Sequence, residues 1–296
     1  MRSVMPHPRT PGSQPKQGQH RLVARTLREK VVPRIFLLAM AILFLIPLYW
    51  MVITAFKTPA ELTSVPPTIW PRSFRWQNFV DAVSAIPFGQ YFVNTVIITG
   101  LSTVGAVVSN LLIAYGFACI KWPGRDFVFY LVIATIFIPF PIVAVPLFDM
   151  FASLHWVNTF LPLIVPAYFG NGFFIFLLRQ FLLQVPPEML EAARIDGAHE
   201  LQIMYRVIMP MVRPALAAVA IFAMIAAWND FLGPLIYLQD DSKRTLAIGL
   251  QFFRSLHDVQ LNLLMAASVL VILPVIILFI LFQRYFIEGV TVGSIR

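Results

Sequence analysis

Long apolar runs, separated by short segments that hold most of the charges, dominate the pattern of this chain. A run of about 20 mostly apolar residues is long enough to cross a bilayer as a helix. Six such segments occur, at residues 35–56, 91–119, 127–148, 160–178, 215–238 and 261–282. The pattern predicts an all-α membrane protein with six transmembrane helices, and it argues strongly against a soluble protein with buried helices.

The composition supports the same class. The 296 residues are 59% hydrophobic and 12% charged, whereas a soluble domain carries about 25% charged residues. A net charge of +8 would suggest a nucleic-acid partner in a soluble protein. In a membrane protein, Lys and Arg instead set the orientation of the spans. Cys119 is the single cysteine, so no disulfide forms within the chain.

The basic residues predict the orientation. With six spans, 16 of the 22 Lys and Arg residues lie on the side that holds both termini. This side should be the cytoplasmic one, so we expect a multi-pass membrane protein with both termini inside. Residues 1–33 are rich in basic residues, Pro and Gln, and predict a disordered cytoplasmic tail. Residues 34–296 then form the transmembrane domain.

Helix breakers interrupt two of the spans. Pro139, Pro141 and Pro146 predict a kinked or locally unwound third span, which membrane proteins tolerate where neighbouring helices satisfy the backbone. Asn171 stands between two glycines in the fourth span. The glycines could unwind the helix and expose its backbone to a solute, or they could produce a simple kink with a packed Asn.

Three further polar residues within apolar spans are candidates for a solute path. Asn110 belongs to a four-residue stripe of small or polar residues in the second span, where close helix packing is the alternative role. Asn229 and Asp230 lie in the fifth span. A charge at a helix centre costs about 2.5–3.5 kcal/mol on insertion scales, so Asp230 should face protein or water. We expect Asn229 and Asp230 to line an outer cavity or gate, with a helix-packing hydrogen bond as the alternative.

The segment 186–214, between the fourth and fifth spans, predicts a helix-turn-helix elbow on the cytoplasmic face. Pro187 suits a helix start and Gly197 a helix end or sharp turn. A second short helix should run over residues 199–209 and stop at Pro210. Small residues such as Ala192 and Ala193 would let a partner approach closely. From the residues alone, docking to a partner and lying on the membrane surface remain equal alternatives.

This segment resembles the "EAA" loop of binding-protein-dependent ABC import permeases. The loop pattern has Glu-Ala-Ala, a later Gly and a terminal Pro, and the matching residues here are Glu191-Ala192-Ala193, Asp196-Gly197-Ala198 and Val207-Ile208-Met209-Pro210. The run Trp228-Asn229-Asp230-Phe231-Leu232-Gly233-Pro234-Leu235 is similar to one in the MalG-like carbohydrate permeases of this family.

The resemblance implies a type I ABC importer permease architecture in a bacterial plasma (inner) membrane and import of a mono- or oligosaccharide. It implies that the elbow couples to an ATPase through Glu191, Ala192, Ala193, Arg194, Asp196, Gly197 and Pro210. The implied partners are a second homologous permease chain, two ATP-binding chains and an extracytoplasmic solute-binding protein. The phosphate-binding pattern Gly-x-x-x-x-Gly-Lys-Ser/Thr does not occur here. We therefore expect no cofactor in this chain, with ATP and Mg bound by the partner ATPases.

Two rival functions remain. One is an ABC permease for glycerol phosphate esters or, more distantly, for a peptide or oxyanion. The other is a secondary transporter or channel that works alone. A secondary transporter needs ion-coupling groups within the membrane. Asp230 alone is weak support for such coupling. This function also leaves the elbow unexplained.

Overall fold

The structure is a computed structural model, and it describes residues 31–254 and 260–291, the last eight of these by backbone alone. All regular elements in these ranges are helices. Of the tail predicted over residues 1–33, residues 1–30 lie outside the described residues, whereas Val32 and Pro33 already belong to a helix. The chain divides into two units, residues 1–52 and 53–296.

The first unit holds most of the helix α2, Val32–Ala55, which contains Pro47 and has Arg34 as its charged residue. At 1.5 Å per residue its 24 residues extend about 36 Å, enough to cross a hydrocarbon core of about 30 Å. The predicted first span is confirmed.

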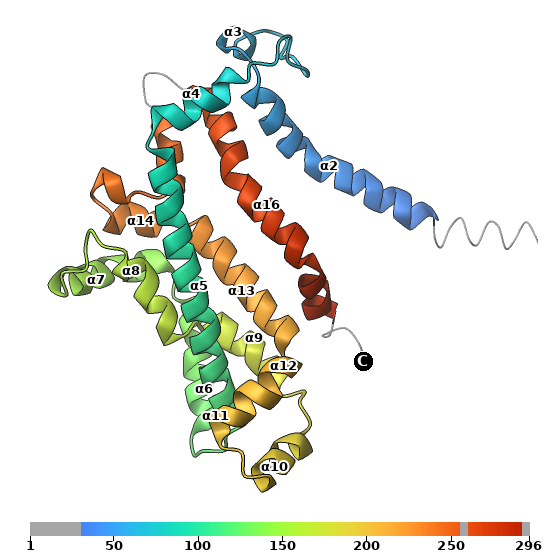
Figure 1. Cartoon of the computed structure of the whole chain (residues 1–296), viewed down its shortest axis with the longest axis vertical. Coiled ribbons are helices and arrows are strands. Elements are labelled where there is room, and N and C mark those ends of the chain that lie inside the picture. The colour runs from blue at the N-terminus through green and yellow to red at the C-terminus, as the bar shows by residue number, and fades with distance from the viewer. Residues whose placement is uncertain (1–30, 255–259, 292–296) are drawn as a thin grey trace, which may run out of the picture. The chain divides into compact units, whose positions relative to one another are not determined.

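The second unit is built around α5, Phe88–Ala118, the predicted second span. This 31-residue helix packs against α13 (Arg213–Trp228), α9 (Gly172–Leu182) and the short helix η3 (Val165–Phe169). Helix α16, Leu261–Thr291, packs on the other side of α13 and continues nine residues beyond the predicted sixth span. In Figure 1 these long helices lie side by side, with α13 between α5 and α16.

Four helical segments in the described residues are long and apolar enough to cross a membrane, and up to six if each of two bent pairs is one span. The first bent pair is the predicted third span. It consists of α6 (Arg125–Ala134) with η2 (Thr135–Phe137), followed after a 100° bend by α7 (Phe140–Ser153). Pro139 is extended at the bend. The predicted break is confirmed, and its cause is proline, which cannot donate to the helical hydrogen-bond ladder.

The predicted fourth span is also interrupted. It begins with α8, Leu161–Ile164, passes through η3, and resumes as α9 after Gly170. Gly170 has a φ of +90°, a conformation that side-chain-bearing residues rarely adopt. The glycine break that the sequence predicts is therefore present.

The predicted fifth span is not one helix, because α13 ends at Trp228 and a separate short helix, α14, covers Leu232–Tyr237. Two side chains explain the interruption. Asn229 Nδ2 donates to the Ile225 carbonyl at 2.8 Å, and Asp230 Oδ1 accepts from the Gly233 amide at 3.1 Å. Short polar side chains of this kind satisfy backbone groups at helix ends and so compete with continuation of the helix.

The end of the second unit near α4 holds the remaining short elements, and it is called here the loop end. These elements are α3 (Pro59–Leu62), α4 (Gln77–Ala85), η5 (Asp241–Lys243), α15 (Leu246–Gly249) and η6 (Leu250–Phe253). Buried Asn78 ties this end together: its Nδ2 donates to the carbonyls of Ala55 and Lys57, and its Oδ1 accepts from Asn262.

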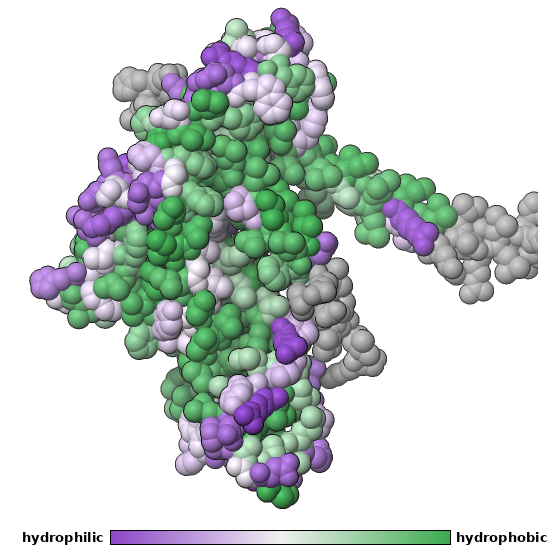
Figure 2. Space-filling view, viewed as in Figure 1, coloured by the Kyte–Doolittle hydropathy of each residue, from purple (hydrophilic) through white to green (hydrophobic). Residues whose placement is uncertain are grey.

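The opposite end of the second unit, called the elbow end, carries α10 (Pro187–Ile195), α11 (Glu200–Ile203), η4 (Met204–Ile208) and α12 (Met209–Met211). Figure 2 shows hydrophilic residues gathered over the loop end, over the elbow end and beside α14, while hydrophobic residues cover most of the length between the two ends. A surface of this kind suits a protein whose middle faces lipid and whose ends face water.

Candidate functional site: the elbow and the central cavity

The first helix of the elbow ends in a tight glycine turn. Gly197 has a φ of +80°. Its amide donates to the Arg194 carbonyl, and the Ala198 amide donates to the Ala193 carbonyl, each at 3.0 Å. This pair of bonds is the Schellman arrangement, in which a glycine just past the helix end lets the chain reverse while the last carbonyls stay paired. The predicted turn at Gly197 is confirmed.

The second half of the elbow differs from the prediction, because the helix does not stop at Pro210. Met204–Ile208 forms a π-helical turn, in which the Met209 amide donates to the Met204 carbonyl, and Pro210 lies in the α-helical turn that follows. Pro210 removes one donor from the helical ladder, and π-helical hydrogen bonding, which is rare, occurs mostly as single turns of this kind within α-helices. The chain changes direction only at Val212, where α11–α12 and α13 meet at an angle of 85°.

A hydrophobic core anchors the elbow. Leu190, Ile203 and Ile208 are buried and belong to the same cluster as Leu111 of α5 and Leu178 of α9. The apolar residues of the elbow are thus packed into the ends of the long helices. The elbow is therefore held by side-chain packing as well as by its two chain connections, and movement of one end should be passed to the other.

Most of the residues predicted to couple to an ATPase are exposed on the elbow. Five of the seven are exposed with no internal ion pair described for them: Glu191, Ala192, Asp196, Gly197 and Pro210. Ala193 is half-buried against the hydrophobic core. Sequence reasoning missed three apolar side chains that share this exposure: Ile195, which is 86% exposed, Met189 and Leu201. An apolar residue on the otherwise polar face of α10 was the signal that could have identified Ile195.

Arg194, the remaining predicted coupling residue, is bonded within the elbow. Its Nε lies 2.9 Å from Glu200 Oε1 and its Nη2 lies 3.4 Å from Glu200 Oε2. The Tyr115 hydroxyl, at the end of α5, donates to Glu200 Oε2. The guanidinium of Arg194, followed by the hydroxyl of Tyr115, lowers the pKa of the Glu200 carboxyl from its ordinary value. Sequence reasoning assigned no role to Glu200 or Tyr115, because the sequence does not indicate that they meet.

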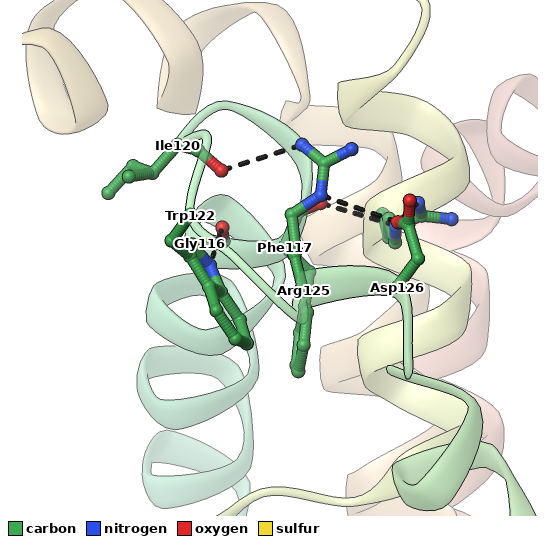
Figure 3. Close-up of polar contacts among 7 residues, drawn as sticks. Gly116, Phe117, Ile120, Trp122, Arg125 and Asp126 are labelled. Carbon is green, nitrogen blue, oxygen red and sulfur yellow. Dashed lines mark hydrogen bonds and ion pairs between the residues drawn. The ribbon is translucent and has the colours of Figure 1, made fainter. Parts of the chain in front are cut away.

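The turn between α5 and α6 lies at the same end, and its backbone is held by side chains (Figure 3). The Trp122 indole donates to the Gly116 carbonyl at 3.1 Å, and Arg125 donates to the Ile120 carbonyl at 3.4 Å. Arg179 of α9 joins this turn through Asp126 at 3.2 Å and through the Phe117 carbonyl at 3.3 Å. These contacts fasten the ends of α5, α6 and α9 together beside the elbow.

A cavity of about 590 Å³ lies among α5, α7, η3, α9 and α13. Binding sites for small solutes are commonly of about 300–1,000 Å³. Three of the four predicted path residues line it, namely Asn110, Asn171 and Asp230. Asn229 does not line it and is exposed elsewhere on the surface. The lining also includes Phe140 and Phe174, and among the residues that the structure describes it includes no Lys, Arg or His.

The two asparagines of this cavity are bonded to each other. The backbone amide of Asn171 donates to Oδ1 of the Asn110 side chain at 2.7 Å, and Nδ2 of the same side chain donates to the Ala106 carbonyl. The Asn171 side chain accepts from the amides of Phe173 and Phe174 and so caps α9. Asn110 is fully buried, so in this structure its amide serves packing, whereas Asn171 both caps a helix and is exposed toward the cavity.

Asp230 contributes a carboxylate to the wall of the cavity. One oxygen, Oδ1, accepts from the Gly233 amide at the start of α14. The other, Oδ2, lies so close to Gly233 that a Cβ added there would come within 2.5 Å of it. The residue thus places a polar group at the cavity wall, and its described hydrogen bond is a local one to Gly233 rather than the helix-packing bond that the sequence offers as the alternative. Among the side chains that the structure describes, no group of three His, Cys, Asp or Glu residues is placed to hold a metal ion.

Comparison with known proteins identifies the family. Residues 110–292, more than half of the chain, match the family described as "binding-protein-dependent transport system inner membrane component". The chain therefore belongs to this family and is a permease subunit.

Several relatives are similar over nearly the whole chain. The arabinooligosaccharides transport system permease protein AraQ of Halalkalibacterium halodurans is 35% identical over 86% of this chain and 92% of its own length. The diacetylchitobiose uptake system permease protein NgcG of Streptomyces coelicolor is 30% identical over 91% of this chain and 90% of its own. The sn-glycerol-3-phosphate transport system permease protein UgpE of Yersinia pestis is 30% identical over 86% of this chain and 93% of its own.

The fold has a solved counterpart. A chain of a bacterial ABC transporter involved in the import of the acidic polysaccharide alginate matches with a TM-score of 0.75 and 22% identity, over 94% of this chain and all of that chain. The similarity confirms the predicted all-helical fold of a type I ABC importer permease.

Proposed function

We propose that this chain is the transmembrane permease subunit of an ATP-driven importer for a carbohydrate, and that it forms half of the translocation path. The observation that carries the proposal is that the elbow and the cavity share one set of helices. The exposed elbow packs against α5, α9 and α13, and residues of the same helices line the cavity. The relatives that transport arabinooligosaccharides and diacetylchitobiose support a mono- or oligosaccharide as the solute.

The chemistry of the cavity favours an uncharged solute over a phosphate ester. Sugar hydroxyls are donors and acceptors, which the Asp230 carboxylate and the exposed amide of Asn171 complement. Phe140 and Phe174 add flat apolar surface. A phosphate is usually bound by Arg, Lys or backbone amides, and the described lining holds one carboxylate and no basic side chain. This argues against glycerol 3-phosphate, the solute in the name of one relative.

The energy would come from two separate ATP-binding chains that bind ATP and Mg, with the elbow seated in a groove of one of them. Glu191 would pair with a basic residue of the ATPase, and the exposed Ile195 and Met189 would supply apolar contact. The elbow and both termini would then lie on the cytoplasmic side, which the distribution of Lys and Arg in the sequence supports. A second homologous permease would complete the path, and an extracytoplasmic binding protein would deliver the solute to the loop end.

The test is reconstitution of this chain with the products of neighbouring genes in liposomes. Uptake and ATP hydrolysis would be measured with the solute-binding protein and a panel of neutral sugars, glycerol 3-phosphate and no solute. We expect ATP-dependent uptake of a neutral sugar. Uptake of glycerol 3-phosphate alone would overturn the substrate class. Uptake by this chain alone, driven by an ion gradient without ATP, would overturn the ABC assignment and make Asp230 an ion-coupling candidate.

A further inference from the structure

We propose that Tyr115, Glu200 and Arg194 form a coupling relay that transmits movement of the elbow to α5, and through α5 to the wall of the cavity. The proposal rests on the function proposed above and assigns a positioning role to two residues outside the elbow's partner-facing surface. It is carried by three hydrogen bonds that join three separate elements at one carboxylate.

The first step is the position of Glu200 between the two halves of the elbow. It is the first residue of α11, whereas Arg194 belongs to the last turn of α10. The two contacts between guanidinium and carboxylate therefore bridge the turn at Gly197. A two-point contact fixes relative orientation as well as distance, so the two helices of the elbow should move together.

The second step is the connection to α5. The elbow is joined covalently to α9 and α13, but α5 is separate in the chain. Tyr115 is 4% exposed, and its hydroxyl reaches out of the hydrophobic core to the same Glu200 carboxylate. A hydrogen bond to a charged acceptor is stronger than one between neutral groups. Through this bond the elbow acts directly on the end of the long central helix.

The third step is the path from Tyr115 to the cavity. Asn110 lies five residues earlier on α5, about 7.5 Å along the helix axis. Its side chain holds the backbone of Asn171 at the break before α9. A shift of the α5 end therefore acts on the cavity wall at Asn110 and on the interrupted helix beside it. Packed side chains and hydrogen bonds that form a contiguous chain of this kind can carry energetic coupling between distant sites.

The experiment compares variants of the reconstituted complex and reads the ratio of solute transported to ATP hydrolysed. Tyr115→Phe removes one hydroxyl, and Glu200→Gln removes the charge while retaining an acceptor. Tyr130→Phe is the matched control, because it deletes a hydroxyl from α6 at a side chain that is 70% exposed. We expect ATP hydrolysis to continue in both relay variants while the transport ratio falls by at least about five-fold, the lower range for coupling between sites. The control should keep the wild-type ratio.

The double variant Tyr115→Phe/Glu200→Gln sharpens the test. Residues that act through one contact are not additive, so its ratio should be close to that of the worse single variant. An unchanged ratio in Tyr115→Phe, or a loss of hydrolysis and transport in equal proportion, would overturn the relay and leave Tyr115 a packing residue. If Glu200→Gln does not assemble, Tyr115→Phe decides alone. Absence of ATP-dependent uptake in the wild type would instead refute the proposed function, and the relay with it.

Discussion

The backbone amide of Asn171 donates a 2.7 Å hydrogen bond to Oδ1 of Asn110, and this contact joins the continuous helix α5 to an interrupted one. Gly170 supplies the left-handed backbone of the interruption, and Asn171 caps the helix that follows. Irregular backbone at membrane depth is tolerated where protein satisfies its polar groups or where it lines a cavity. Both conditions hold at Asn171.

Replacing the buried asparagine should therefore destabilise the protein. Asn110→Leu keeps the volume similar but leaves the Asn171 amide without its acceptor, which costs about 1–3 kcal/mol. We expect the apparent midpoint of thermal unfolding to fall by several degrees, at about 2–4 °C per kcal/mol for a chain of this size. Asn229→Ala is the control, since Asn229 is exposed and its side chain donates only to the Ile225 carbonyl in the last turn of α13. Equal shifts in the two variants would contradict the account.

Two variants of Asp230 should separate the structural role of this residue from its role in the solute path. Asp230→Asn retains an oxygen to accept from Gly233 but removes the charge, whereas Asp230→Ala removes both. We expect Asp230→Asn to unfold near the wild-type temperature while its solute uptake falls about ten-fold or more, since a hydrogen bond to a charged group is worth about 1.5–3 kcal/mol. Asp230→Ala should lose stability as well. Normal uptake by Asp230→Asn would restrict this residue to capping.

The turn of the elbow should depend on backbone conformation rather than on space. A Cβ at Gly197 would meet no atom within 4 Å, yet its φ is +80°. Gly197→Ala should cost about 1–2 kcal/mol through conformation alone, and Gly197→Asn should cost less, because Asn adopts left-handed backbone more readily. The measurement is the yield of assembled complex and its ATP hydrolysis. An alanine variant that performs better than the asparagine variant would count against this explanation.

The contact between Arg194 and Glu200 should persist through the neutral range and fail in acid. The pKa of Glu200 lies below its ordinary value because of Arg194 and then Tyr115. A carboxyl with a lowered folded-state pKa adds stability that is complete above its unfolded pKa and is lost as the pH falls through the folded one. The stability difference between wild type and Glu200→Gln should be constant above roughly pH 5.5 and shrink below about pH 4.5. Thermal unfolding across that range measures it, and a difference that grows toward acid would be inconsistent.

Much of the fold could be predicted from local pattern. Apolar run length placed α2, α5 and the start of α16, and proline and glycine placed the breaks at Pro139 and Gly170, because these residues constrain the backbone wherever they stand. The predicted helix end at Pro210 was wrong, since a preceding π turn accommodates the proline. The single fifth span was also wrong, because Asn229 and Asp230 satisfy backbone groups at a break that average hydropathy does not reveal.

The contacts between helices could not be predicted. Glu200 and Tyr115 are 85 residues apart in the chain, and Asn110 and Asn171 are 61 apart. Helical periodicity indicates which residues share a face, but which faces meet depends on the packing of the whole bundle. The partner-facing role of Glu191 and the solute-path role of Asp230 thus remain predictions that the structure makes geometrically reasonable.

The central claim is that the elbow couples this permease to an ATPase, and one substitution tests it most directly. The complex would be purified in lipid, and ATP hydrolysis would be measured with the solute-binding protein and its sugar for wild type, Glu191→Ala and Glu188→Ala. Glu188 lies one turn earlier on α10 and controls for loss of a negative charge near the helix start. We expect sugar-stimulated hydrolysis in the wild type, retention of most of it in Glu188→Ala, and its collapse in Glu191→Ala with weakened binding of the ATPase. Full stimulation in Glu191→Ala, or the absence of any ATPase bound to the wild type, would contradict the account.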